Sequence, residues 1–560
     1  MGKSVVIIGG GVAGMSAAHE LIRRGFSVEV YEAKAVPGGK ARSVTIPNTG
    51  KAGRKDLPGE HGFRFFPRFY RNLPDTKRTT ILADGHSTAA DNLVQADTEL
   101  IARKGQPDVL ALARFPRTLD DFKTFFREIT QSLGLTEEEE HFAAERMWQL
   151  ATSCDERRAN DYERMGWWEF VEAERFSPTY RALFAVGFTR TLVAARARSA
   201  STAVGGSILL QLVYGAITPG PSTDRLLNGP TNDAWIDPWL NYLLRSGVRY
   251  HLSAPATHIE CKDGRIDFIT VQTKDGEKQV RGDAYLCAVP VEVMAKLLKS
   301  SDILKYDPSL ESILALSKEV AWMNGMQLYL SKDITVDPGH TMYVNTPWAL
   351  TSVSQAQFWP DYNLADYGDG DIKTILSIDI SNWDAKGILE HPPHGEHKAA
   401  KECTRREIRN EVVAQLMSSL NKEGQPPMLV EEDVHEWYID SDIEPVDIFA
   451  GRVPMEDLEP LLVNKVNTWQ LRPEAHTQIP NLFLASDYVK TDISLATMEG
   501  ANEAARRAVN SIIDATGVDV PYCTVYPLRE PWIFTLYRRA DKRRYDRGLP
   551  WNGKLDIFGL

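Results

Sequence analysis

The stretch Lys3-Ser4-Val5-Val6-Ile7-Ile8-Gly9-Gly10-Gly11-Val12-Ala13-Gly14 decides the fold of this chain. Its apolar opening is typical of a buried strand, and the small residues that follow it are typical of a helix. Ser27-Val28-Glu29-Val30-Tyr31 is a second predicted strand, and it places Glu32 at its end. The order predicts a strand, a glycine turn, a helix and a second strand that ends on an acid.

This order is typical of a nucleotide-binding turn. Gly9 would make the tight turn, Gly11 would let a pyrophosphate approach the backbone, and Gly14 would let the helix lie close to the strand. Free N–H groups at the start of the helix favour the anion. Glu32 follows the glycines by about 20 residues, where a carboxylate binds the ribose hydroxyls of an adenosine and repels a 2′-phosphate.

A second glycine turn follows, Ala33-Lys34-Ala35-Val36-Pro37-Gly38-Gly39-Lys40-Ala41-Arg42-Ser43. A nicotinamide site does not need it, whereas a flavin needs a second close approach of backbone and cations near its pyrophosphate. The alternative is an ordinary solvated turn. Further along, Glu60 to Asn72 interleaves arginines with aromatic residues, which favours a loop that lines a ligand over a segment of plain core.

Length and composition restrict the class of protein. A chain of 560 residues is long enough for two or three domains. A net charge of −12 argues against nucleic acid as the main partner. The five cysteines are scattered without a CxxC spacing, so we expect reduced thiols and no metal site.

The ends and apolar runs of the chain bear on its location. The glycine turn begins within ten residues of Met1, which leaves no room for a signal peptide. No apolar run approaches the roughly 18 residues that span a bilayer. We therefore expect a cytoplasmic protein, and peripheral membrane contact stays open.

The rest of the chain alternates in character. Residues 75–225 are predicted to be mainly helix and loop, with helices over Leu119 to Leu133 and Glu137 to Leu150. Short strands separated by Asp-Gly turns follow residue 226, and strands alternate with a helix at 403–420 in the stretch 320–470. Three aromatic-rich segments are candidate walls of an apolar tunnel: Phe63 to Tyr70, Trp167 to Phe188 and Trp348 to Phe358.

The chain resembles the flavin amine oxidase and phytoene desaturase superfamily. The likeness rests on Glu32-Ala33, on Gly38-Gly39-Lys40, on the Glu60 to Asn72 stretch, and on Ala485-Ser486-Asp487-Tyr488 with Leu495 to Ala501. Within the superfamily it is most similar to plant and cyanobacterial carotene desaturases and to hydroxysqualene dehydroxylase-like proteins. Arg64 stands where plant-type desaturases often carry a histidine.

The resemblance implies an α/β fold. A discontinuous Rossmann-like FAD-binding domain of the glutathione reductase and amine oxidase type would be interleaved with an α+β substrate domain. The FAD-binding parts would be residues 1–80, 226–318 and 470–520. The substrate domain would have a helical part, 81–225, and a sheet part, 319–469, and 521–560 would form a basic aromatic tail.

The resemblance also implies a non-covalent FAD and the residues around it. The residues expected to bind the cofactor are Gly9, Gly11, Ala13, Gly14, Glu32, Ala33, Gly39, Lys40, Arg42, Gly62, Phe63, Arg64, Ala256, Asp487 and Met498. Among them, Met498 would direct its N–H group, at a helix start, toward the flavin ring. Arg64 and Lys490 are the candidate catalytic residues. No second glycine fingerprint is present for a nicotinamide, so a quinone or dioxygen is the expected electron acceptor.

Three functions fit these features. The first is an FAD-dependent oxidoreductase that acts on an apolar isoprenoid or polyene as a desaturase, dehydroxylase or isomerase. The second is an amine or amino-acid oxidase that releases hydrogen peroxide, with Trp437 and Trp469 as an aromatic cage. The third is a protein that binds FAD without catalysis.

The tail from residue 521 carries eight basic and four acidic residues with aromatic side chains between them. Such a segment is suited to an anionic membrane surface beside a lipid substrate. It is equally suited to packing on the acidic body of the same chain, or on a second subunit in a homo-oligomer. The sequence leaves these three alternatives open.

Overall fold

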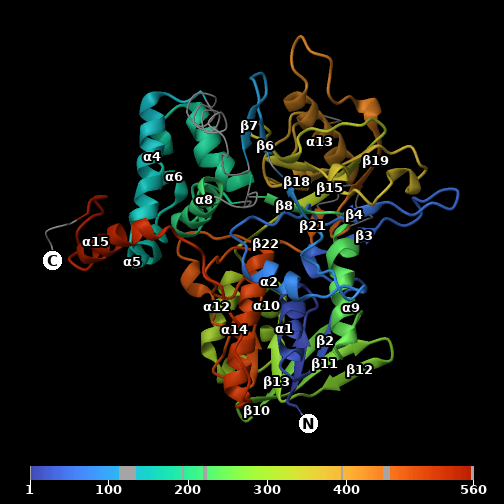
Figure 1. Cartoon of the computed structure of the whole chain (residues 1–560), viewed down its shortest axis with the longest axis vertical. Helices are drawn as coiled ribbons and strands as arrows, with labels where there is room; N and C mark the ends of the chain where they lie inside the picture. The colour runs from blue at the N-terminus through green and yellow to red at the C-terminus, as the bar shows by residue number, and fades with distance from the viewer. Residues whose placement is uncertain are drawn as a thin grey trace.

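The computed structural model describes residues 2–96, 98–112, 134–191, 195–218, 224–391, 395–445 and 455–555. The predicted helix over Leu119 to Leu133 lies outside them. Figure 1 shows two parts stacked along the long axis, a nucleotide-binding part below and a second part above, with helices and a sheet side by side. The chain passes between the two parts several times.

A five-stranded parallel sheet forms the centre of the lower part. Its order is β23-β13-β1-β2-β9, with β1 at Ser4–Ile8, β2 at Ser27–Tyr31, β9 at Arg249–His251, β13 at Ala284–Cys287 and β23 at Leu482–Leu484. Three distant stretches of the chain thus build one sheet. This mixed α/β architecture, with a Rossmann-like sheet and a separate second part, confirms the predicted fold class.

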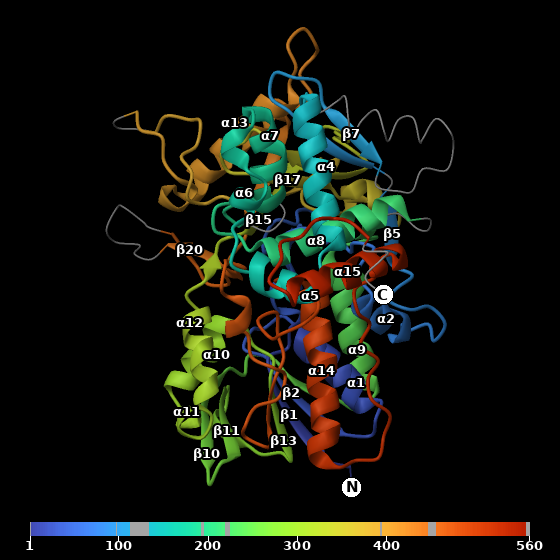
Figure 2. The same ribbon diagram turned by 90° about the vertical axis from the view of Figure 1, so that its left-hand side faces the viewer.

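Different elements cover the two faces of this sheet (Figure 2). Helices α1 (Val12–Ile22) and α14 (Met498–Thr516) pack on one face. The antiparallel meander β10 (Ala256–Lys262), β11 (Arg265–Thr273) and β12 (Gly276–Val280) lies over the other. The meander is the one that the Asp-Gly turns predict, and its apolar residues belong to the same core as the sheet.

The upper part contains a seven-stranded sheet. Its order is β19-β15-β18-β17-β16-β6-β7, with β6 at Thr98–Ala102, β7 at Val109–Leu112, β15 at Asn324–Leu330, β16 at Gly339–Tyr343, β17 at Leu350–Ser354, β18 at Thr374–Ile380 and β19 at Val434–Ile439. Helix α13 (Arg405–Leu420) packs on one face, where Met326, Leu328, Ile378 and Ile380 meet it. The opposite face is turned toward the nucleotide-binding part.

The helical part of the upper half differs in one respect from the prediction. Helix α4 (Glu137–Thr152) begins at a capping box of Thr136 and Glu139, as expected for that acidic start. However, residues 75–225 also contain the hairpin β6–β7 and strand β5 (Leu93–Ala96), which pairs with β8 (Asp224–Leu227). These strands are short and reach their partners β16 and β8 only in the tertiary fold, so local periodicity does not reveal them.

The remaining α-helices and strands connect these layers, and all of them except α8 are short. They are α2 (Asn72–Thr79), α5 (Asp155–Arg157), α6 (Trp167–Phe170), α7 (Pro178–Tyr180), α8 (Thr202–Ile217), α9 (Asp237–Arg245), α10 (Val291–Lys299), α11 (Ile303–Tyr306), α12 (Glu311–Leu316), β3 (Ser43–Thr45), β4 (Pro58–Glu60), β14 (Val320–Ala321), β20 (Ile443–Pro445), β21 (Met455–Asp457) and β22 (Leu461–Leu462). Within the described residues, no helix combines the length and the apolar character needed to cross a bilayer.

The C-terminal tail packs on the helical part through α15 (Thr535–Tyr545). Asp541 is buried and forms an ion pair with Arg157 at 3.0 Å. Trp148 of α4 meets the rings of Phe534 and Tyr537. Of the alternatives for the tail, the structure thus shows packing on the body of its own chain.

Candidate active site

A cavity of about 820 Å³ lies between the two sheets. This volume is within the range of about 300–1,000 Å³ for small-molecule sites. Thirteen of the residues predicted to bind the cofactor line it: Gly9, Gly11, Ala13, Glu32, Ala33, Gly39, Lys40, Gly62, Phe63, Arg64, Ala256, Asp487 and Met498. Three segments that are distant in sequence therefore meet around one space.

One end of the cavity is formed by the first glycine turn. The N-cap of α1 is Gly11, whose position provides no side-chain acceptor for the first N–H groups of the helix. These groups open onto the cavity beside Ala13, where the helix dipole favours an anion. This end has the chemistry that a pyrophosphate requires.

Glu32 stands beside this turn at the end of β2. Its carboxylate accepts hydrogen bonds from the N–H groups of Gly10 at 2.6 Å and Lys34 at 2.8 Å. Burial raises the pKa of Glu32, and these two donors act in the opposite direction. The two donors fix the orientation of the carboxylate, which a contact with ribose hydroxyls would require.

Gly14 does not line the cavity and has a packing role. A methyl group at Gly14 would lie 1.9 Å from the carbonyl oxygen of Gly9. No side chain fits there without moving the backbone. The close approach of helix to strand is thus the one that the spacing predicts.

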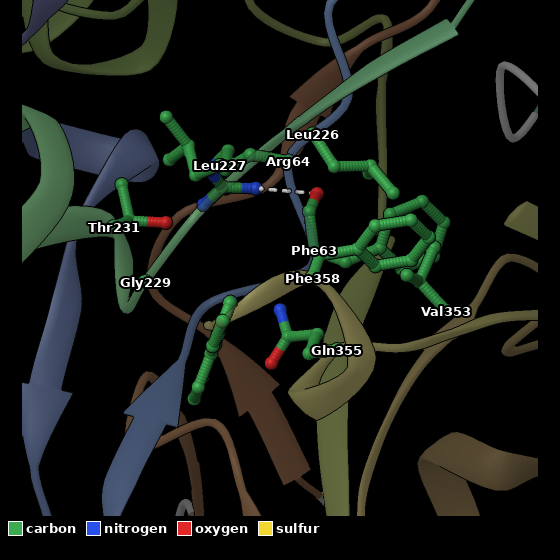
Figure 3. A pocket seen from close by; sticks show the side chains of 10 residues that line it. Phe63, Arg64, Leu226, Leu227, Gly229, Thr231, Val353, Gln355 and Phe358 are labelled. Carbon is green, nitrogen blue, oxygen red and sulfur yellow. Dashed lines mark hydrogen bonds between the residues drawn. The ribbon is translucent and has the colours of Figure 1, made fainter. Parts of the chain in front are cut away.

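The second glycine turn places Lys40 at the cavity wall. Its ammonium donates to the carbonyl of Pro460 at 2.5 Å and lies 3.6 Å from the carboxylate of Glu292. Arg64 lies next to it, because its guanidinium donates to the carbonyl of Lys40 and, at 3.2 Å, to that of Phe63. Figure 3 shows Arg64 and Phe63 in a smaller pocket beside the cavity, and both residues line both spaces.

Arg42, predicted to flank the cofactor, does not line the cavity. Its buried guanidinium pairs with the carboxylates of Asp442 and Glu459. In this cluster Nδ1 of His61 lies 2.5 Å from the carboxylate of Asp440. Burial alone would lower the pKa of His61, but the charge of Asp440 raises it. Arg42 is thus held by two acids that lie about 400 residues further along the chain, so local sequence does not predict this contact.

The same cluster contains three groups with the residue types of a metal site. Ligand atoms of His61, Asp440 and Asp442 lie within 4.8 Å of one another. Asp442 already pairs with Arg42 and, at 2.7 Å, with Lys34. The protein's own cations thus supply the positive charge that these carboxylates need.

Lys490, the second residue predicted to be catalytic, also lies outside the lining of the cavity. Its ammonium pairs with Glu474 at 3.2 Å and stands 5.3 Å from the ring centre of Trp469. Trp469 itself donates to Ser494 and does not line the cavity, and neither does Trp437. The aromatic cage expected of these two tryptophans is not formed at the cavity.

The C-terminal block contributes the start of α14 to the wall. Thr497 caps the helix by accepting from the N–H group of Gly500, and Met498 and Ala501 line the cavity behind it. The N–H groups of this first turn are suited to an anionic ring oxygen. Asp487, after β23, lines the same side.

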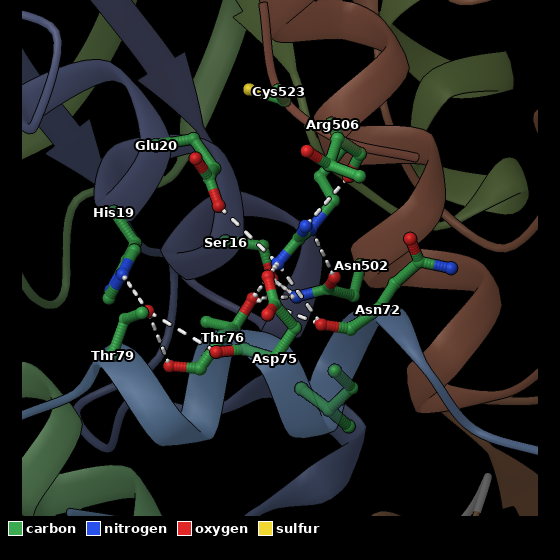
Figure 4. Close-up of polar contacts among 12 residues, drawn as sticks. Ser16, His19, Glu20, Asn72, Asp75, Thr76, Thr79, Asn502, Arg506 and Cys523 are labelled. Carbon is green, nitrogen blue, oxygen red and sulfur yellow. Dashed lines mark hydrogen bonds and ion pairs between the residues drawn. The ribbon is translucent and has the colours of Figure 1, made fainter. Parts of the chain in front are cut away.

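A buried polar network holds α14 in this position (Figure 4). The guanidinium of Arg506 donates to the carbonyl of Asn72 at 3.1 Å and to Asp75 at 2.9 Å on α2. Asn502 donates to Ser16 of α1 at 2.7 Å. The network locks three helices together, so the start of α14 keeps its place relative to the glycine turn.

The other half of the cavity lies against the seven-stranded sheet. One row across four of its strands faces the space, and the register pairs its members in order: Ile101, Met342, Thr351 and Asp379. Helix α8 closes the opposite side with a stripe at helical spacing: Ile208, Leu212, Val213 and Ala216. Phe65, Phe69 and Tyr70 complete this apolar wall.

Of the three predicted tunnel segments, Phe63 to Tyr70 supplies most of its aromatic residues to the wall. Among the described residues, Trp167 to Phe188 contributes none to the lining, and Trp348 to Phe358 contributes only Thr351. Trp167 and Trp348 are fully buried in separate cores. Their aromatic content reflects packing.

Sequence reasoning missed several polar residues of the lining, among them Glu99, Asp224, His340, Thr351 and Asp379. Burial raises the pKa of Asp379 to about 7, and its Oδ1 atom has no hydrogen-bond partner. The available signal was an acid inside a run of buried apolar strand residues, as at Asp379 between Ile378 and Ile380.

Comparison with known proteins agrees with this geometry. The family model described as flavin containing amine oxidoreductase matches residues 12–513. A carotenoid phi-ring synthase of Chlorobaculum tepidum is 45% identical over 69 residues, which are 12% of this chain and 10% of that protein. The chain thus spans only a small part of this curated relative.

Solved structures share the fold at low identity. A putrescine oxidase is 13% identical with a TM-score of 0.58 over 92% of this chain and 99% of that one. Cyclohexylamine oxidase from Brevibacterium oxydans is 14% identical with a TM-score of 0.57, over 92% of this chain and 100% of that one. An oxidoreductase from Methanosarcina mazei is 13% identical with a TM-score of 0.54, over 91% of this chain and 100% of that one.

The family match covers most of the chain, and the cavity has the cradle that its cofactor requires. The cofactor is FAD, and the protein is an oxidoreductase. None of the five cysteines, all of them in the described residues, lines the cavity, so none is placed for a thioether link to the flavin. The chain belongs to the flavin-containing amine oxidoreductase family.

Proposed function

We propose that this protein is an FAD-dependent oxidoreductase that acts on an apolar isoprenoid or polyene as a desaturase, dehydroxylase or isomerase. The observation that carries the proposal is the apolar wall of the cavity, formed by the α8 stripe and the Phe65 to Tyr70 segment opposite the sheet. A wall of this kind solvates a hydrocarbon chain and excludes water. The carotenoid-modifying relative supports the same substrate class.

The cofactor would be held by residues of the lower part. Glu32 would bind the adenosine ribose, the start of α1 at Gly11 would hold the pyrophosphate, and Met498 would direct its N–H group toward the flavin ring. The flavin supplies a hydride acceptor at N5, and a quinone or dioxygen would restore its oxidised form.

The chain's own residues would position the substrate and take up a proton. Apolar side chains of α8 would orient the hydrocarbon over the Gly62 to Arg64 segment. Asp379 stands next to this segment, since a methyl group at Gly62 would lie 2.7 Å from its Oδ1 atom. With a pKa of about 7, that unpartnered oxygen is suited to accept the proton lost when a double bond forms.

The test uses purified holoprotein with a soluble quinone. We expect phytoene or a related polyene to lose two hydrogens under anaerobic conditions, with reduction of the quinone. A dehydroxylase would instead remove the hydroxyl group of hydroxysqualene only when its flavin has first been reduced, and an isomerase would change the retention time of a polyene without a change in mass. Asp379→Asn should slow turnover at least tenfold while FAD stays bound. If the whole lipid panel is unchanged and the quinone stays oxidised, the substrate class is wrong.

Oxidation of an amine is the second candidate. Its support is the set of carboxyl groups on the cavity wall, Asp379 among them, because a carboxylate attracts an ammonium group. Hydrogen peroxide released on a panel of amines would favour it. A non-catalytic flavoprotein is not proposed, because the family is one of oxidoreductases.

We also propose contact between the tail and an anionic bilayer. Trp532, Ile533 and Leu536 are exposed, with Trp532 at 81%, at the start of α15, a helix that carries basic residues in its last turn. An apolar patch beside basic residues is suited to the headgroup region. Flotation with phosphatidylserine vesicles should be lost when these three residues are changed to serine. An equal flotation of the variant would contradict the contact.

A further inference from the structure

Two carboxyl groups meet in the wall of the cavity without any cation between them. Glu99 comes from β6 and Asp224 from β8, and the two side chains share a hydrogen bond. Both residues line the cavity. Among the described residues, neither takes part in an ion pair with a lysine, an arginine or a histidine. Two buried carboxyl groups that share a hydrogen bond retain one proton between them.

Polar atoms without partners surround this acid pair. Asp224 is 2% exposed and His340 is 5% exposed, and the Oδ1 atom of the first and the Nε2 atom of the second have no hydrogen-bond partner. His340 is the register partner of Glu99 on the neighbouring strand, so it stands beside the pair. Buried polar atoms without partners are costly, and a ligand that satisfies them gains that free energy.

The surroundings keep the pair protonated and the histidine neutral. Burial, and then the negative charge of Asp224, raise the pKa of Glu99 well above its ordinary value. Burial lowers the pKa of His340 to about 4. Burial raises the pKa of Asp224 and outweighs the charge of Arg225, which acts to lower it. Arg225 donates its hydrogen bonds to the carbonyls of Phe66 and Pro67, and Asp337 is a further acid, hydrogen-bonded to Thr98.

We infer that Glu99, Asp224 and His340 form a binding site for a hydroxyl group of an otherwise apolar substrate. The inference rests on the proposed function, because it assigns the polar end of the same isoprenoid-like substrate. A hydroxyl group both donates and accepts. It would donate to the unpartnered Oδ1 of Asp224 and accept from the Nε2–H group of neutral His340, while the retained proton stays between the two carboxyl groups.

The rest of the wall is consistent with a hydroxyl group as the ligand. The pair lies in the apolar half of the cavity, beside Ile101 and Val109. A pure hydrocarbon would leave the oxygen of Asp224 without a partner, whereas an ammonium group would displace the shared proton. The uncharged hydroxyl group satisfies the pair without requiring a full charge in this wall.

The experiment measures binding, not turnover, by equilibrium dialysis of the holoprotein with labelled farnesol and with farnesene. Farnesol should bind more tightly than its hydrocarbon analogue. Asp224→Asn and Glu99→Gln should each weaken farnesol binding at least tenfold and leave farnesene binding within a factor of two. Asp337→Asn is the matched control, because this neighbouring acid does not line the cavity, and it should leave both unchanged.

The pH dependence distinguishes a hydroxyl group from an ammonium group. Farnesol affinity should fall as rising pH removes the shared proton, and the two variants should lose this dependence. Farnesylamine that binds more tightly than farnesol, with affinity that rises with pH, would overturn the inference in favour of a cation site. Equal losses for farnesol and farnesene would show a structural role only. Farnesol binding that depends on the pair, without turnover of any isoprenoid, would keep the inference and reject the proposed reaction.

Discussion

The carboxylate of Glu499, in the first turn of α14, accepts a hydrogen bond from the N–H group of Asn72, the first residue of α2, at 2.7 Å. The same carboxylate accepts from the N–H groups of Arg71 at 2.8 Å and Leu73 at 2.9 Å. One buried acid thus satisfies the free donors at the start of α2 and complements its dipole. It stands next to Met498, so the contact joins the N-terminal aromatic stretch to the proposed flavin-facing turn.

Glu499→Gln should destabilise this junction. The amide presents an NH₂ group to donors that need an acceptor, so we expect the free energy of unfolding to fall by about 2–3 kcal/mol. Thermal melting of the holoprotein measures it, and FAD should be released at lower temperature. Glu137→Gln, at an exposed helix start, is the control. A melting temperature equal to that of the wild type would show that the carboxylate does not hold the two helices together.

Two glycine variants separate the fold from the cofactor site. Gly14→Ala places a methyl group 1.9 Å from the carbonyl oxygen of Gly9. This clash should lower the free energy of unfolding by at least about 1–3 kcal/mol. In Gly11→Ala the new methyl group would lie 3.5 Å from its nearest neighbour, the Cα atom of Gly39, which is an ordinary contact. This variant should leave the melting temperature of the apoprotein unchanged. Because its methyl group enters the proposed pyrophosphate site, it should weaken FAD binding. Equal FAD affinity in Gly11→Ala and the wild type would contradict the placement.

Glu32→Gln tests the adenosine end of the cavity. We expect the variant to bind FAD about tenfold more weakly, since hydrogen bonds to a charged group contribute about 1.5–3 kcal/mol. FMN lacks the adenosine and should bind the variant and the wild type alike. Fluorescence quenching of the two flavins measures both affinities. A parallel loss of FMN affinity would mean that the change disturbs the turn rather than the ribose contact.

His19 should make the protein sensitive to acid. It is fully buried on α1, and burial and then Arg23 lower its pKa from 6.5 to about 3. Below pH 6.5 the unfolded chain binds a proton that the native one excludes, so stability falls as pH falls, by up to about 1.4 kcal/mol per pH unit. His19→Gln should flatten this dependence between pH 6.5 and 4. If the melting temperatures of the wild type and the variant fall equally over this pH range, His19 is not the group that makes the protein sensitive to acid.

Asp541 should determine whether the tail stays on the body. Its carboxylate pairs with Arg157 and accepts from the N–H group of Cys154 at 2.9 Å. Removal of one member of a buried pair costs about 3–5 kcal/mol. Asp541→Ala should therefore expose the tail to trypsin, with cleavage followed by mass spectrometry. Asp546→Ala, at an exposed i,i+4 pair with Lys542, is the control and should resist cleavage like the wild type.

Much of the nucleotide-binding part follows from local sequence. The apolar run of β1, the glycines and the acid at the end of β2 are read within one segment, because strand and helix periods are local properties. The Asp-Gly turns likewise predict the β10–β12 meander. Strands β6 and β7 were missed because they are short and their stability comes from β16, which lies far along the chain.

The sequence by itself determined the fold class, the glycine turn with Glu32, and the three segments that meet around the cofactor. Only the tertiary structure decided which polar groups face the cavity. It turned Arg42 toward Asp442 and Glu459, placed Lys490 on Glu474, and brought Glu99 to Asp224. The physical reason is that the partner of a charged or proton-sharing group depends on which groups lie close to it in the folded chain and on how deeply they are buried. The local pattern of polar and apolar residues does not contain this information.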